Sequence, residues 1–206
     1  NQTNGTWYYT RNGGTTWTAV GTVSNTSALL LAANASTRLY FAPRANYSGT
    51  STAALTVRAW DQSSGTAGSK VSTATNGGKT AFSSATDTVD VTVTAVNDAP
   101  TAVADVFETT ENLPLVVPAR GILANDTDVD SGDTRTVTAV NGSAGNIGTQ
   151  IALASGALLT LNANGSLAYD PNGQFESLAA GQTTTDSFTY TITDSQGATD
   201  IATATI

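Results

Sequence analysis

The chain has 206 residues, of which 12% are charged and 39% are hydrophobic, and its formal net charge is −8. It contains no Cys, Met or His, which excludes Ser-His-Asp and Cys-His catalysis, disulfides and the usual zinc sites. Residues 1–100 carry a net charge of +2 and residues 101–206 one of −10. This charge disfavours nucleic acid and anionic membrane surfaces as partners and favours hard cations. The apolar runs are too short for membrane insertion.

Short alternating apolar and polar segments recur along the chain, and no stretch has a sustained helical period. A hairpin is predicted between residues 7–10 and 15–17, because Asn12-Gly13 supplies the positive φ of a tight turn. Further strands are predicted at residues 55–59, 89–96, 137–140, 158–161 and 188–192. Strands at this spacing without helices between them indicate an all-β fold of antiparallel β-sandwiches.

The predicted strand that ends at residue 96 is followed by Asn-Asp-Ala-Pro, which breaks it. We therefore expect one domain at residues 1–96, a linker at 97–100 and a second domain at 101–206. Residues 55–65 and 188–197 share a pattern of strand, aspartate and polar turn with glycine, so the two domains read as diverged repeats. The first repeat is expected to lack its opening strands, since nothing in it matches residues 104–133.

An acidic loop at residues 125–133 places four aspartates within eight residues. Carboxylates spaced in this way can turn inward around a cation, because their mutual repulsion disfavours the empty loop. The loop is not an EF-hand: its glycine comes one place late, Val137 stands where the final glutamate belongs, and no helices flank it. A solvated acidic loop without a metal is the alternative interpretation.

The sequence resembles the cadherin-like repeats of large bacterial surface adhesins of the RTX type, often classed as VCBS or tandem Ig-like repeats. The motifs that carry the resemblance lie at residues 95–100, 111–114, 128–132, 178–181 and 186–194. They cover the second repeat nearly from end to end. The first repeat is similar to a variant of these repeats, and the motifs that carry this similarity lie at residues 5–8, 13–17 and 58–61. The resemblance implies two tandem antiparallel Ig/cadherin-like β-sandwich domains.

The resemblance also implies calcium between consecutive domains. Carried over by position, the junction ligands would be the Asn97 carbonyl, Asp98, Asp128, Asp130 and Asp194. Glu111 and Asp170 would serve a following repeat at the opposite pole, and Asp61 a preceding one. The sequence departs from the family at Ala99, where cadherins usually have a liganding asparagine, and at residues 42–44, where an acidic motif is missing. We therefore expect one or two ions, fewer than at an animal cadherin junction.

The function expected from these features is a non-catalytic, calcium-rigidified extender of a secreted or cell-surface adhesin, in cell adhesion or biofilm formation. Its partners would be neighbouring repeats of the same chain. A calcium-dependent carbohydrate-binding module that recognises surface glycans is the alternative. That module would use the aromatic residues of the first repeat: Trp7, Tyr8, Tyr9, Trp17, Tyr40, Tyr47 and Trp60. Packing in the core and a cross-strand pair of Trp7 with Trp17 compete with that interpretation.

An enzyme is the third interpretation. Glu108, Glu111 and Glu176 could form the carboxylate pair of a glycoside hydrolase, but such a pair needs a deep cleft, which small sandwiches rarely build. A Ser69–Lys70 nucleophile is disfavoured, because adjacent side chains diverge on a strand.

Overall fold

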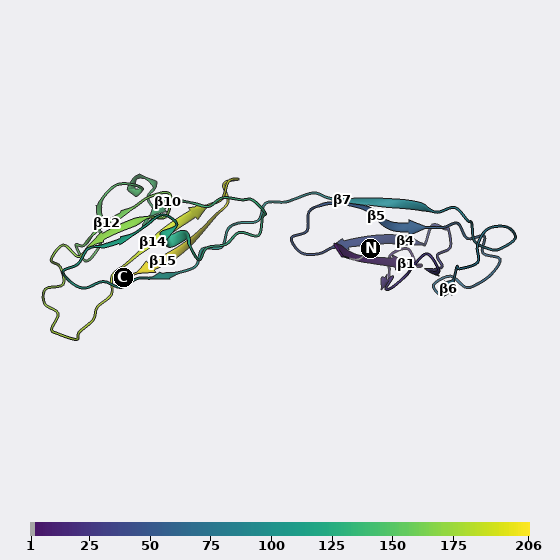
Figure 1. The fold of residues 1–206 in the computed structure, drawn as a ribbon, viewed down its shortest axis with the longest axis horizontal. Helices are drawn as coiled ribbons and strands as arrows, with labels where there is room; N and C mark the ends of the chain where they lie inside the picture. The colour runs from purple at the N-terminus through teal and green to yellow at the C-terminus, as the bar shows by residue number, and fades with distance from the viewer. Residues whose placement is uncertain (1–2) are drawn as a thin grey trace. The chain divides into compact units, whose positions relative to one another are not determined.

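The computed structural model describes residues 3–206, and the chain divides into two units, Asn1–Ala95 and Val96–Ile206. The predicted all-β class is confirmed: in the described residues the regular structure consists of strands and two short 3-10 turns (Figure 1). Unit 1 contains β1 (Gly5–Thr10), β2 (Thr18–Ala19), β3 (Ser27–Leu29), β4 (Arg38–Pro43), β5 (Gly49–Val57), β6 (Lys70–Ser72) and β7 (Asp87–Val93). Unit 2 contains β8 (Asp105–Val106), β9 (Leu115–Val117), η1 (Gly121–Leu123), β10 (Thr136–Val140), η2 (Ala144–Asn146), β11 (Ile151–Ala152), β12 (Leu158–Leu161), β13 (Leu167–Asp170), β14 (Ser187–Thr193) and β15 (Thr199–Thr205).

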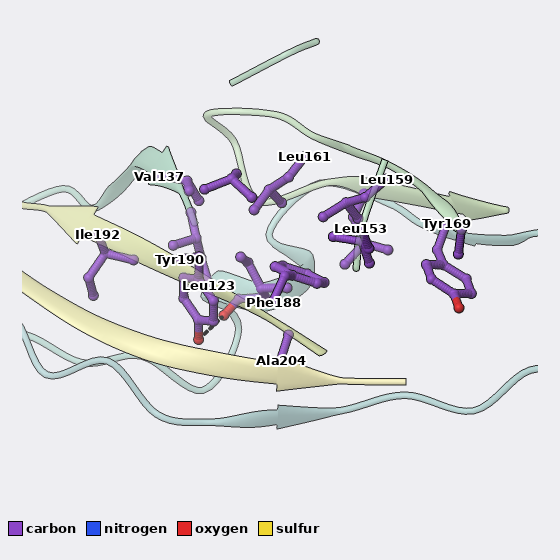
Figure 2. Close-up of a cluster of buried hydrophobic side chains, with 14 residues drawn as sticks. Leu123, Val137, Leu153, Leu159, Leu161, Tyr169, Phe188, Tyr190, Ile192 and Ala204 are labelled. Atoms are coloured by element: carbon purple, nitrogen blue, oxygen red, sulfur yellow. Dashed lines mark hydrogen bonds between the residues drawn. The ribbon is translucent and has the colours of Figure 1, made fainter. Parts of the chain in front are cut away.

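Unit 2 is built from two four-stranded sheets, of order β10-β14-β15-β8 and β11-β12-β13-β9. The alternation along β14 directs Phe188, Tyr190 and Ile192 inward, where each is at most 2% exposed. They meet side chains of the second sheet, among them Leu159 and Leu161 (Figure 2). This contiguous core fixes both ends of β14, and with them the positions of Asp186 before the strand and Asp194 after it.

The first strand of unit 2 runs parallel to the last one, in an otherwise antiparallel pair of sheets. Before that strand, the chain is fixed by backbone hydrogen bonds between Thr101 and Thr127 and by a 2.9 Å bond from the Ala102 N–H to Oδ2 of Asp200. We call the end of unit 2 that holds residues 97–102, 126–133 and 194–200 the linker pole. The far pole is the opposite end, with residues 107–112, 178–186 and Ile206.

Unit 1 has smaller sheets, β2-β1-β4, β5-β7 and β3-β6. Its buried cluster consists of Trp7, Val20 and Ala54, with partly buried neighbours from β4, β5 and β7. In the described part of unit 1, no strand pairs with the outer edge of β7, which is the position that β8 takes beside β15 in unit 2. The expectation that the first repeat lacks its opening strands stays a prediction.

The hairpin predicted at the start of unit 1 is wrong in two details. β1 pairs with residues 18–19, so residues 11–17 form a longer loop than the tight turn expected from Asn12-Gly13. Trp7 does not pair with Trp17: its ring packs on Phe41 of β4, with centroids 5.2 Å apart. Local turn residues predicted the reversal of the chain, whereas the side chains of the loop set its length.

Candidate metal centre

Three carboxylates meet at the linker pole of unit 2. One oxygen from each of Asp128, Asp133 and Asp194 lies within 4.8 Å of the other two. Two oxygens bound to one Ca²⁺ at its usual distances lie no more than about 5 Å apart. Asp194 is buried and the other two residues are half-buried. The spacing of these oxygens therefore suits a single shared cation.

The acidic loop is held in place by its own backbone and by the turn after β14. Oδ1 of Asp128 accepts a hydrogen bond from the Asp130 N–H at 2.9 Å, and the Asp133 N–H donates to the Asp130 carbonyl at 3.2 Å. Oδ1 of Asp133 accepts from the Ser195 N–H at 2.9 Å. These contacts place two loop carboxylates beside the one at the end of β14.

Asp194 is fixed by hydrogen bonds to both of its carboxylate oxygens. Oδ1 accepts from the N–H groups of Gln196 and Ala198, each at 2.8 Å, and Oδ2 accepts from Nδ2 of Asn97 at 2.8 Å. The Asn97 hydrogen bond is the main cause of a lowered pKa for Asp194. The pKa of Asp133 is also lowered, chiefly by its hydrogen bonds to Ser195. Both carboxyl groups therefore stay charged down to a lower pH than an ordinary aspartate does.

One oxygen of the cluster has no protein partner. Oδ2 of Asp128 is buried and accepts no hydrogen bond. A buried carboxylate oxygen without a partner is destabilising, and a cation would satisfy it. Because the surrounding donors are all carboxylate oxygens, the cluster fits a hard cation such as Ca²⁺ better than a transition metal.

The linker residues contact this cluster. The Asn97 side chain lies between Asp194 and Gln196, whose Nε2 donates to Oδ1 of Asn97 at 2.6 Å. The Asp98 N–H donates to Oδ2 of Asp130 at 2.8 Å, while Asp98 itself is exposed. The linker is thus attached to the acidic loop and to the end of β14 by separate hydrogen bonds.

The structure brings together only some of the predicted junction ligands. Asp128 and Asp194 share the cluster with Asp133, which sequence reasoning included in the acidic run but not among the ligands. Asp130 binds the linker backbone and is outside the group of three. No sequence signal distinguishes Asp133 from the other aspartates of the run, because its position depends on a hydrogen bond from the distant Ser195 N–H.

A second pair of acidic residues consists of Asp126, near the start of the acidic loop, and Asp105. Asp126 is 3% exposed; its Oδ1 accepts from the Val103 N–H at 2.7 Å and its Oδ2 has no hydrogen-bond partner. Burial raises the pKa of Asp126 and also that of Asp105, whose Oδ2 accepts from the Tyr190 hydroxyl at 2.7 Å. These two carboxyls tie the start of unit 2 to its core.

The acidic residues predicted to face neighbouring repeats lie apart from the cluster. Glu111, at the far pole, is half-buried and lines a hollow of about 770 Å³, while Asp170 is exposed and accepts from the Asn172 N–H. In unit 1 Asp61 is exposed and accepts from both the N–H and the hydroxyl of Ser63, which lowers its pKa. In the part of the chain that the structure describes, none of the three joins a group of three acidic ligands.

The groups considered for catalysis lie in different surroundings. Glu108 and Glu111 line the far-pole hollow, but Glu176 is not part of its lining. The Ser69 hydroxyl donates to the Thr66 carbonyl at 2.6 Å and the Lys70 ammonium to the Thr22 carbonyl at 2.8 Å. The serine and the lysine therefore bind different partners and do not form a nucleophilic pair.

The aromatic residues of unit 1 range from buried to exposed. Trp7 is buried and its Nε1 donates to the Ala54 carbonyl at 3.3 Å, as expected for packing. Trp60 donates to the Ser64 carbonyl at 2.7 Å. Trp17 and Tyr40, by contrast, are exposed. The other four, Tyr8, Tyr9, Tyr47 and Trp60, are half-buried.

A family model matches the second half of the chain. The family model described as the bacterial cadherin-like domain matches residues 97–206, which is unit 2 with its linker and more than half of the chain. No curated protein matches the sequence. Within residues 3–206, no helix has the length and apolar character needed to cross a membrane.

Proposed function

This chain belongs to the bacterial cadherin-like domain family, and we propose that it is a pair of extender repeats of a bacterial surface adhesin, stiffened by calcium at the linker. Domains of this family are adhesion-type extracellular repeats and are typically non-catalytic.

The observation that carries the proposal is the group of carboxylates at the linker pole. Asp128, Asp133 and Asp194 would hold the ion, and Oδ2 of Asp128 has no other partner. When bound, calcium supplies positive charge that offsets the repulsion among the three carboxylates. Asn97 then orients Asp194 through its amide, and Asp130 holds the Asp98 N–H. The ion would thereby fix the linker to unit 2.

The mechanical role follows from where the chain is held. If residues 97–98 are fixed to unit 2, fewer rotatable bonds remain between the two units, and the tether becomes stiffer. Extracellular calcium modules bind at about 10⁻⁴–10⁻³ M, so the linker would be loose in a calcium-poor cytoplasm and stiff outside the cell. Neighbouring repeats of the same polypeptide are the partners that this role requires.

Calorimetric titration of the full chain with calcium tests the site. We expect binding in the range given above, and we expect Asp128→Asn to weaken it at least about tenfold, since outer-shell changes alone reach that size. Asp170→Asn removes an exposed carboxylate at the far pole and is the matched control. Absence of binding, or an equal effect of the two substitutions, would contradict the site.

Small-angle scattering tests the stiffening separately. We expect calcium to narrow the distribution of distances within the full chain, and we expect EDTA to reverse the change. Asp128→Asn should scatter like the EDTA-treated protein at any calcium concentration below its own dissociation constant. If calcium binds in the calorimeter but leaves the scattering unchanged, the metal site stands and the mechanical role is wrong.

A further inference from the structure

Three aromatic side chains gather on one face of the β2-β1-β4 sheet of unit 1. Tyr8 of β1 and Tyr40 of β4 are directly opposite each other, with ring centroids 6.4 Å apart. Trp17, just before β2, meets Tyr40 edge-on at 5.9 Å. We call Tyr8, Trp17 and Tyr40 the aromatic platform. It draws on three separate segments of chain, which the sheet brings together.

The platform is on the solvent side of the sheet. Along β1 the neighbouring residue Trp7 points to the opposite face and packs in the core with Phe41. Tyr40 is 53% exposed and Trp17 is 43% exposed. Large aromatic side chains usually bury most of their surface, so rings this exposed are available to a ligand.

Unit 2 shows that the sheet does not need rings at this position. When Pro43 is aligned with Pro171 in the sequence, Phe41 aligns with Tyr169, and the cross-strand partners of these two residues are Trp7 in unit 1 and Leu159 in unit 2. The next, outward pair is Tyr8 with Tyr40 in unit 1 but Thr160 with Ala168 in unit 2. The same place in the two sheets thus holds small residues in one unit and aromatic rings in the other.

The loop that carries Trp17 is held in a fixed conformation. Oδ1 of Asn12 accepts from the Thr10 hydroxyl at 2.8 Å and from the Thr16 N–H at 3.0 Å, and Nδ2 of Asn12 donates to the Thr16 hydroxyl at 2.9 Å. Gly14, with φ of +106°, lies under the indole, where a Cβ would be 3.8 Å from Trp17. A ring held in this way loses little entropy when a ligand stacks on it.

We propose that the aromatic platform binds a neutral saccharide, whose C–H face stacks on the exposed rings. The exposed portion of Trp17 and Tyr40 amounts to roughly 200 Å² if each of these two rings offers about half of the 150–250 Å² that such side chains can bury, and the half-buried Tyr8 extends this surface. A stable protein–protein interface needs about 800 Å² on each partner, so the platform is too small for a second copy and suits one or two sugar rings. Arg38, opposite Thr10 on the same strand pair, supplies N–H donors for sugar hydroxyls.

This binding is independent of the proposed calcium site, because the platform lies in unit 1 and the carboxylate group in unit 2. The full chain is applied to an array of immobilised neutral oligosaccharides that includes β-linked glucosides and galactosides, in calcium and in EDTA. We expect at least one saccharide to be bound in both conditions. Failure of the calcium proposal would leave this result unchanged.

Variants identify the surface involved. Trp17→Ala and Tyr40→Ala should each reduce binding at least about tenfold, whereas Tyr40→Phe, which keeps the ring, should stay within a few-fold of the native chain. The control is Val116→Ala, which changes a side chain of unit 2 that is 73% exposed, and it should have no effect on binding. Lack of binding to every saccharide, or binding that Trp17→Ala and Tyr40→Ala leave intact, overturns the proposal. A dimer in sedimentation that Trp17→Ala dissociates would also overturn it, in favour of a second copy as the occupant.

Discussion

Nδ2 of Asn97 donates a hydrogen bond to Oδ2 of Asp194 at 2.8 Å, although the two residues are 97 positions apart in the sequence. The bond joins the linker to the end of β14, a strand whose inward side chains are in the core of unit 2. Linker position and core packing are therefore coupled through one side-chain amide and one carboxylate.

Removing this amide should raise the pKa of Asp194 towards its ordinary value, because the Asn97 hydrogen bond is the largest cause of the lowered pKa. A carboxyl group whose pKa is lowered in the folded state stabilises that state at a pH above the ordinary pKa. This stabilisation is lost as the pH falls through the lowered pKa. In EDTA, Asn97→Ala should thus be less stable at neutral pH and lose less on acidification. Carboxyl carbon NMR of Asp194 measures the shift. Asn112→Ala, which removes a similar amide at the far pole, should leave Asp194 unchanged.

Asp133 and Asp130 are predicted to differ in their effect on calcium binding. Asp133→Asn should weaken binding more than Asp130→Asn, since Asp133 belongs to the group of three carboxylates and Asp130 holds the linker backbone. We expect a loss of about tenfold or more for Asp133→Asn, by analogy with outer-shell changes. Calorimetry on both variants decides the order, and a larger loss for Asp130→Asn would favour the ligand set expected from the family resemblance.

Much of the fold of unit 2 follows from its sequence, because the alternation of Phe188, Tyr190 and Ile192 requires one buried face. The end of that strand places Asp194, so this site residue is also predictable. The role of Asp133 is not, since it depends on a hydrogen bond from the Ser195 N–H, which is distant in sequence. Asn12 predicted a tight turn, but its side-chain hydrogen bonds to Thr16, four residues later, hold a longer loop.

The Tyr190 hydroxyl should be important for the stability of unit 2. It lies 2.7 Å from Oδ2 of Asp105 and 2.9 Å from the Val103 carbonyl, on a ring that is 1% exposed. Tyr190→Phe removes the hydroxyl donor to Oδ2 of Asp105, and losing a donor to a buried polar group costs about 1–3 kcal/mol. Chemical denaturation of the full chain, followed by a probe specific to unit 2, measures the loss. An unchanged midpoint would contradict this role for the hydroxyl.

Asp105 should make the stability of unit 2 depend on pH. Burial raises its pKa in the folded state, so its contribution to stability is complete below the ordinary pKa and is lost as the pH rises through the raised value. Asp105→Asn keeps an acceptor for Tyr190 and removes the titrating group. The Tm of the variant relative to the native chain should therefore be more favourable at pH 7 than at pH 4. Asp170→Asn accounts for the loss of one surface charge, and a pH-independent difference for Asp105→Asn would refute the prediction.

The position of a bound ion tests the account most directly. Crystals of the full chain grown with terbium, a calcium substitute that scatters anomalously, would locate the ion without reference to any prior phase information. We predict a single strong anomalous peak within coordination distance of carboxylate oxygens from Asp128, Asp133 and Asp194. Strong peaks only elsewhere, with solvent beside those three aspartates, would contradict the proposal that the linker pole is a calcium site.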